Sequence, residues 1–328
     1  MPINSDLVHE GFRVSVIIPT YHAGPVFEEL LASLQRQTLL PHEIIIVDSS
    51  SADGTAALAQ RMGARVFTVL QSEFDHGGTR NYAAGLAKGD ILVFMTQDAM
   101  PDHEQMLEEL VRPFHNEQIS CTYARQLPRP QENILEKLSR GFNYPDQAII
   151  KDKNDILRLG IKTFFCSNVC AAVRRETFYE VGRFPEPVIF NEDMFLAAKC
   201  ILSGYSIAYA ANSRVIHSHD YSLLQQFRRF FDNGVSMRNS DWLSEYTAVG
   251  KEGSRLLRTQ LQALHQQRAW HWIPRLIAEM AAKWIGFQLG KRYELLPKPL
   301  RVRFSMHRKM WDKLNASHAS SKGVSKSI

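Results

Sequence analysis

The sequence predicts an α/β protein in which a Rossmann-like nucleotide-binding sheet, covered by helices on both faces, precedes a mainly helical C-terminal region. In the first hundred residues, short runs rich in β-branched residues alternate with segments of helical periodicity, the pattern of parallel strands joined by crossover helices. The runs Ile44-Ile45-Ile46-Val47 and Ile91-Leu92-Val93-Phe94 are apolar throughout, which indicates strands buried between two helical layers.

The elements of this sheet can be placed in chain order. Strands are expected at Arg13–Ile18, Glu43–Val47, Arg65–Leu70 and Asp90–Met95, and helices at Pro25–Arg36, Gly54–Met62 and Gly77–Lys88. In open α/β sheets the ligand binds beyond the carboxyl ends of the strands. The residues directly after each strand are therefore the first candidates for a site.

Polar and turn-forming residues follow the first two strands. Pro19, Thr20 and Tyr21 come after the first, and Asp48 ends the second. A carboxylate at that edge can accept a hydrogen bond from a ribose hydroxyl or a base N–H, so we expect Asp48 to bind a ligand. For Asp53, a little further along, a turn leading into a capped helix and a ligand contact are equally good interpretations.

The segment Asp75-His76-Gly77-Gly78-Thr79-Arg80 opens the third helix. Glycines let a backbone approach a ligand closely, the free N–H groups of a first helical turn attract anions, and a guanidinium pairs well with phosphate. Contact with a diphosphate or a base is favoured here over plain loop chemistry.

Composition excludes several classes of protein. With 45% hydrophobic residues in 328, and no long uncharged apolar run, the chain is neither disordered nor a multi-pass membrane protein. Residues 1–10 lack the basic start and apolar stretch of a secretion signal, so a cytoplasmic location is expected. The four cysteines have no zinc-type spacing and are expected to be small buried apolar residues.

The net charge of +5 is unevenly distributed. Residues 251–328 hold 16 basic and 4 acidic residues, whereas residues 1–250 hold 23 basic and 30 acidic ones. An amphipathic helix is expected between Trp270 and Phe287, with an apolar stripe that includes Leu276 and Trp284. It suits the surface of an anionic membrane, and packing on the catalytic part or in a homo-oligomer is the alternative. No nucleic-acid partner is expected, because no recognised binding module accompanies the charge.

These motifs, in this order, resemble the family 2 glycosyltransferases of the GT-A fold, and most closely the bacterial dTDP-rhamnose-dependent rhamnosyltransferases. The resemblance runs from about Arg13 to about Asn239. It implies a catalytic domain over residues 1–250, with a nucleotide-sugar half at about 12–100 and an acceptor half at about 101–250. The basic region 251–328 follows it.

The resemblance also implies roles for single residues. Pro19, Thr20 and Tyr21 would line the base pocket, and Asp48, Arg80 and Gln97 would contact the nucleotide sugar. Asp98 matches the last carboxylate of the family's metal-binding Asp-X-Asp signature, whose first position is Thr96 here. The chain therefore departs from the family at one expected metal ligand.

Other ligands could complete a site for Mg²⁺ or Mn²⁺. Mg²⁺ keeps several waters and binds phosphates, while Mn²⁺ also accepts imidazole. His217 and His219 are two residues apart, and lie on one face if the chain is extended there. In related enzymes a downstream histidine joins the metal. We expect His217 first and His219 second, against the alternative of ordinary polar residues at a strand end.

The family's Glu-Asp motif matches Glu192 and Asp193, which makes Asp193 the expected general base. The alternative is that Asn191 caps a helix running to Ser203 and the two carboxylates only complement its dipole. Arg228 and Arg229 are expected as a second phosphate clamp, although a solvated helix face is as good an interpretation for one of them. Acceptor contacts are expected within residues 128–165.

The predicted function is an inverting transfer of L-rhamnose from dTDP-β-L-rhamnose to a hydroxyl of a lipid-linked or polysaccharide acceptor in bacterial cell-surface glycan synthesis. The protein would work in the cytoplasm, peripheral on the inner face of the membrane. Two alternatives stay open at this point. One is a UDP-sugar-dependent enzyme of the same fold, and the other, motivated by Thr96, is a non-catalytic sugar-nucleotide-binding scaffold.

Overall fold

The computed structural model describes residues 11–246 and 251–315. The opening segment, on which the expectation about export rests, lies outside these residues, as does the end of the basic C-terminal region. Within the described chain no helix is long and apolar enough to cross a membrane.

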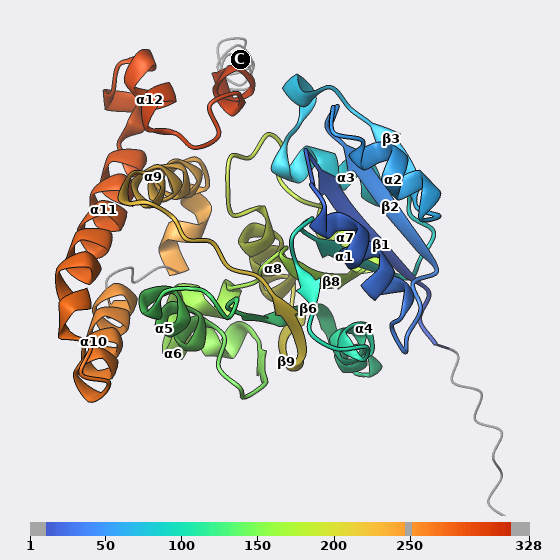
Figure 1. Cartoon of the computed structure of the whole chain (residues 1–328), viewed down its shortest axis with the longest axis horizontal. Coiled ribbons are helices and arrows are strands. Elements are labelled where there is room, and N and C mark those ends of the chain that lie inside the picture. Colours follow the sequence, from blue (N-terminus) through green and yellow to red (C-terminus); the bar gives the residue numbers. More distant parts are fainter. Residues whose placement is uncertain (1–10, 247–250, 316–328) are drawn as a thin grey trace, which may run out of the picture.

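One large mixed sheet runs through the molecule (Figure 1). Its path has the order β3-β2-β1-β4-β8-β6-β9-β5, and β7 pairs with β9 at the side. The strands are β1 (Val14–Thr20), β2 (Glu43–Asp48), β3 (Arg65–Thr68), β4 (Ile91–Met95), β5 (Met100–Pro101), β6 (Ile119–Leu127), β7 (Ile149–Lys151), β8 (Cys170–Arg174) and β9 (Ser206–Ile216).

The predicted first half of the sheet is confirmed. Strands β1 to β4 are parallel, and the register places Thr20 beside Asp48 where β1 and β2 end. The second half changes direction, because β8 is antiparallel to β4 and β6 is antiparallel to β8. Strand β9 then runs parallel to β6, which carries the chain after Ile216 to the same edge as β4.

As expected, helices cover both faces of the sheet, and further helices form the C-terminal region beyond it. They are α1 (Val26–Gln35), α2 (Thr55–Arg61), α3 (His76–Leu86), α4 (Met106–Val111), α5 (Ile134–Asn143), α6 (Ile156–Leu159), α7 (Arg175–Glu180), α8 (Glu192–Leu202), α9 (Leu223–Asn239), α10 (Lys251–Gln266), α11 (Ile273–Lys291) and α12 (Lys298–Phe304). Helices α3 and α8 pack in one apolar core and α1 and α4 in the other. The four cysteines are free and buried, as expected.

The C-terminal region packs against the rest of the chain through α11, which lies along α9. Glycines make this contact: a Cβ on Gly290 would lie 2.1 Å from the carbonyl oxygen of Phe231, and one on Gly286 2.3 Å from that of Phe227. The two backbones touch only because these positions have no side chain. The packing alternative is thus confirmed for this side of the helix, whereas Ile277 and Trp284 are 57% and 65% exposed.

Candidate active site

The ends of β1, β2 and β4 meet in a network of short hydrogen bonds. The Thr20 hydroxyl donates to Asp48 Oδ1 (2.9 Å), which also accepts from the Ser51 hydroxyl (2.6 Å). Gln97 joins the end of β4 to that of β1, because its amide accepts from Tyr21 N (2.8 Å) and donates to Tyr21 O (3.1 Å). The residues predicted to hold the base therefore lie at one edge of the sheet, with the Tyr21 ring exposed.

Asp53 forms the turn that leads into a helix, which was one of its two interpretations. Its Oδ1 accepts from the hydroxyl and the N–H of Thr55, and Oδ2 from Gly24 N. Gly54, which follows, has φ +84°, a conformation that favours glycine. These contacts fix the entry to α2.

Asp98, His217 and His219 come together, as the sequence predicted. Nε2 of His217 lies 3.5 Å from Asp98 Oδ2, and Nε2 of His219 lies 3.6 Å from the same oxygen. One ligand atom from each residue falls within 4.8 Å of the others. One oxygen and two imidazole nitrogens form a donor set that fits a divalent cation which accepts nitrogen, such as Mn²⁺.

Neighbouring side chains orient the His217 ring for binding a cation. Its Nδ1 lies 3.1 Å from the amide oxygen of Gln126, which also accepts from Arg140. Because an amide oxygen can only accept, Nδ1 carries the proton and Nε2 keeps its lone pair toward Asp98. Burial lowers the pKa of His217 and, with His217 beside it, lowers the pKa of His219 to about 4, so both imidazoles are neutral at pH 7.

Glu192 and Asp193 open α8 inside the protein. Asn168 holds both carboxylates, since its side-chain amide donates to Glu192 Oε1 (3.1 Å) and its backbone N–H to Asp193 Oδ2 (3.0 Å). Arg80 Nη1 lies 3.2 Å from the same Glu192 oxygen. Asn191 occupies the N-cap position with φ +65° and Ser203 the C-cap, so the expected helix is confirmed, but the Asn191 side chain makes no capping hydrogen bond. Gly204 follows the helix with φ +96°.

Asp193 has the electrostatics of a proton acceptor. Burial and the charge of Glu192 raise the pKa of Asp193 to about 7, against the opposing effect of the N–H groups of Asn168 and Met194. A general base is most effective when its pKa lies near the working pH. The helix start therefore carries a carboxylate that can both accept and release a proton near neutrality.

The glycines before Arg80 serve packing. A Cβ on Gly77 would lie 2.0 Å from the carbonyl oxygen of Pro185, so this glycine allows the segment before α8 to approach α3. Asp75 stabilises the contact between these two segments, because its carboxylate accepts hydrogen bonds from Gly78 N (2.5 Å) and Val188 N (3.0 Å). The close approach expected for a ligand is made by the protein itself, and the Arg80 side chain is buried beyond it.

Arg229 is held on α9 near His219. The guanidinium of Arg229 lies 4.7 Å from the ring centre of Phe190 and 5.6 Å from that of Tyr221. The Tyr221 ring in turn lies 5.0 Å from the ring of His219 in the candidate metal site. Nε of Arg228 is buried without a protein partner. Arg229 is therefore fixed beside His219, whereas Arg228 is half-buried and its contact with a phosphate stays a prediction.

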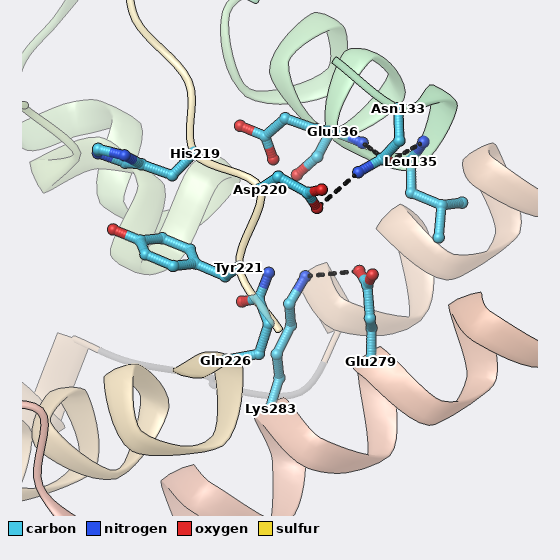
Figure 2. Close-up of a pocket in the computed structure, with 10 residues that line it drawn as sticks. Asn133, Leu135, Glu136, His219, Asp220, Tyr221, Gln226, Glu279 and Lys283 are labelled. Carbon is cyan, nitrogen blue, oxygen red and sulfur yellow. Dashed lines mark hydrogen bonds and ion pairs between the residues drawn. The ribbon is translucent and has the colours of Figure 1, made fainter. Parts of the chain in front are cut away.

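A polar pocket adjoins His219 (Figure 2). It lies between α5, the loop at Asp220 and the facing helices α9 and α11. Gln226 and Lys283 extend into it from α9 and α11, and Lys283 lies 3.9 Å from Glu279. Arg275 links α11 to the loop through Asp220 (3.1 Å).

Comparison with known proteins agrees with this architecture. Residues 15–182 match the sequence model of glycosyl transferase family 2. The chain is 41% identical over 313 residues to the O-antigen chain rhamnosyltransferase WbaN of Salmonella anatum. The aligned region covers 94% of this chain and 98% of the relative. It is 40% identical over 315 residues to RfbN of Salmonella typhimurium, an enzyme of the same description, with coverage of 95% and 99%.

Solved structures share the fold at low identity. A mannosyltransferase of Pyrobaculum calidifontis, in complex with GDP-Man and Mn²⁺, has a TM-score of 0.54 at 21% identity, over 91% of this chain and 85% of that one. TarS of S. aureus in complex with UDP has a TM-score of 0.51 at 17% identity, over 85% and 90%. The expected GT-A architecture is confirmed. This chain belongs to glycosyl transferase family 2 and is a glycosyltransferase.

Proposed function

We propose that the protein transfers L-rhamnose from dTDP-β-L-rhamnose to a hydroxyl of a lipid-linked or polysaccharide acceptor during bacterial O-antigen synthesis. The observation that carries this proposal is the likeness to two O-antigen chain rhamnosyltransferases along almost the whole chain. Such likeness includes the predicted acceptor half and the C-terminal helices as well as the nucleotide-binding sheet, so it goes beyond a shared fold.

The chemistry would be a single displacement at the anomeric carbon. Asp193 accepts the proton of the acceptor hydroxyl, whose oxygen forms the new bond to that carbon. The bond from the carbon to the diphosphate breaks, and the diphosphate leaves with the electron pair. Attack from the opposite face inverts the configuration, so a β-linked donor gives an α-rhamnoside.

The positive charges of the site would bind the departing diphosphate. Arg80, which is buried on α3, and Arg228 and Arg229, which are half-buried on α9, would supply this charge. Asp98, His217 and His219 would hold a divalent cation, Mn²⁺ before Mg²⁺, which supplies further charge to the diphosphate when bound. Pro19, Thr20, Tyr21, Asp48 and Gln97 would form the base and ribose pocket.

Donor identity is tested by incubating the purified protein with a panel of nucleotide sugars, Mn²⁺ and a lipid-linked acceptor. Transfer from dTDP-rhamnose above all others is the expected result. If the protein prefers a UDP-sugar, it is still a glycosyltransferase, but the proposal that it transfers rhamnose is wrong. Calorimetry with dTDP-rhamnose and UDP-glucose measures the same choice at the level of binding.

For the acceptor, we propose the polar pocket beside His219. Carboxylates, amides and a tyrosine are the groups that bind sugar hydroxyls, and residues 133–139 of the pocket lie in the segment expected to contact the acceptor. Gln226 is buried, and among the described contacts its amide has no protein partner, so it is available to a ligand in this space.

Replacing Gln226 by Ala is expected to raise the KM for the acceptor about two- to tenfold, the effect of one lost neutral hydrogen bond. The KM for the donor should stay unchanged. Steady-state kinetics with each substrate varied in turn measures the two constants, and Gln262→Ala on the exposed face of α10 is the control. A rise in the donor KM instead would place the donor, and not the acceptor, next to this pocket.

We also propose peripheral binding to the inner face of the cell membrane through α11. Ile277 and Trp284 are exposed and seven residues apart, which places them on one face of the helix, and Lys291 continues that face. Exposed apolar groups next to cations suit an anionic lipid surface.

The double substitution Ile277→Ser with Trp284→Ser is expected to weaken binding to vesicles of anionic lipid at least about tenfold, since burying such side chains contributes about 1.5–3 kcal/mol each. Point variants are preferable to deleting residues 251–328, because deletion would uncover the face of α9 that α11 covers. Co-sedimentation at low and high salt measures the effect, with Val302→Ser on α12 as the control. Unchanged binding would leave α11 as a packing element alone.

A further inference from the structure

The C-terminal segment 305–314 reaches back to the start of α3. His307 lies beside His76, with 3.4 Å between Nδ1 of His307 and Nε2 of His76 and ring centres 4.6 Å apart at 85°. Figure 1 shows this red end of the chain next to the blue-to-cyan segment that precedes α3. Two residues separated by 231 positions are therefore neighbours at the site.

The segment is firmly anchored on both sides. The N–H of His307 and that of the residue before it donate to Asp232 Oδ2 on α9, at 3.1 and 2.8 Å. Trp311 is buried against Tyr293, with ring centres 5.4 Å apart. Lys313 Nζ donates to the carbonyl oxygen of Phe74 (3.2 Å), directly before α3. These contacts fix where the His307 ring points.

The imidazole pair is surrounded by the charged groups of the active site. Burial is the main reason that the pKa of His76 and that of His307 fall to about 3. The positive charge of Arg229 lowers both values further, Arg80 acts in the same direction on His76, and Glu192 opposes the effect on His307. The two rings are therefore neutral, between the cations of α3 and α9 and the Glu-Asp motif of α8.

Some hydrogen-bond donors near His307 have no partner in the protein. In the described part of the chain, Nε2 of His307 has no protein partner, and Nε of Arg80 is buried without one. If each ring carries its proton on Nε2, His76 donates to His307 and the Nε2–H of His307 remains free. The free Nε2–H of His307 and the unused Nε of Arg80, whose Nη1 donates to the carbonyl oxygen of His76 (2.9 Å), match the oxygens of an anion, and a diphosphate is the anion of this reaction.

We propose that His307 donates from Nε2 to the diphosphate of the nucleotide sugar, and that His76 and the anchored segment 305–314 hold it in place for this contact. The proposal rests on the proposed nucleotide-sugar donor. It adds a residue that binds the nucleotide sugar and lies outside residues 15–182, which match the family model. The part of the chain that takes part in the reaction would then extend past residue 250.

The test is binding of dTDP, UDP and thymidine, measured by calorimetry in the presence of Mn²⁺. His307→Ala should weaken the binding of the diphosphate about tenfold or more, as expected for a lost hydrogen bond to a charged group, and leave thymidine within about twofold. The control is Arg308→Ala, an exposed neighbour in the same segment. Thermal unfolding of each variant reports its folding.

Two conservative variants separate binding from packing. The side-chain amide of Gln reaches the place of Nε2, whereas that of Asn reaches the place of Nδ1, which faces His76. His307→Gln should therefore retain more affinity for the diphosphate than His307→Asn. The reverse order, or an equal loss for thymidine and dTDP, would overturn the role of His307. A wild-type protein that binds neither dTDP nor UDP would overturn the proposed donor itself.

Discussion

Replacing Asp193 by Asn is expected to lower kcat by about 10²–10⁴, the usual contribution of a general base. Asn has almost the same shape as Asp but cannot accept the proton of the acceptor hydroxyl. Donor affinity should change little, because the contacts of Asp193 are to the N–H groups of Asn168 and Met194 and not to the arginines. Stopped assays of sugar transfer give kcat, and calorimetry with the donor gives the affinity.

The same assignment fixes the pH dependence. With a pKa of about 7, Asp193 is protonated and inactive on the acid side, so kcat/KM should fall about tenfold per pH unit below about 7. Unfolding of the region around Asp193 would not cause this fall in kcat/KM at low pH. A raised pKa means that Asp193 favours the folded state most at low pH, and that this contribution is lost as the pH rises through about 7.

The control for this prediction is Glu104→Gln, an exposed carboxylate outside the site. It should leave kcat and the pH profile unchanged. Full activity in Asp193→Asn, or a flat profile of kcat/KM between pH 5.5 and 8 in the wild type, would remove the base from this position.

The first half of the fold was predictable because each strand carries its own signal. Strands β1, β2 and β4 are mainly apolar, β3 carries a short apolar pair, and polar or turn-forming residues stand at or directly after the ends of β1, β2 and β4, so the expected bounds of the four strands differ from the observed ones by two residues or fewer. The antiparallel strands β6 and β8 contain small and polar residues such as Thr122 and Ala171, and their pairing depends on partners far along the chain. No local pattern specified them.

The same distinction applies to the active site. Asp98, His217 and His219 could be predicted because they follow strands whose ends meet at one edge. Asn168, which holds both carboxylates of α8, and His307 could not, since only tertiary packing brings them there. Gly77 illustrates the opposite error. Its lack of a side chain suggested a ligand, whereas the close neighbour is the Pro185 carbonyl.

Removing the divalent cation with a chelator is expected to reduce activity by at least about 100-fold, and Mn²⁺ should restore it better than Mg²⁺. With Thr96 in place of a carboxylate, two of the three candidate ligands are imidazoles, which Mn²⁺ accepts more readily than Mg²⁺ does. An enzyme that Mg²⁺ restores equally well would depend on phosphate and water ligands, and not on the histidines.

Substitutions at the triad make this prediction specific. His217→Ala should weaken Mn²⁺ binding more than about 100-fold, because even supporting groups around metal ligands contribute 10- to 100-fold. His219→Asp replaces a nitrogen ligand by oxygen and should shift the preference toward Mg²⁺. Electron paramagnetic resonance of free Mn²⁺ in the presence of dTDP measures binding without turnover, and His42→Ala, an exposed histidine, is the control. Unchanged Mn²⁺ affinity in His217→Ala would place the cation elsewhere.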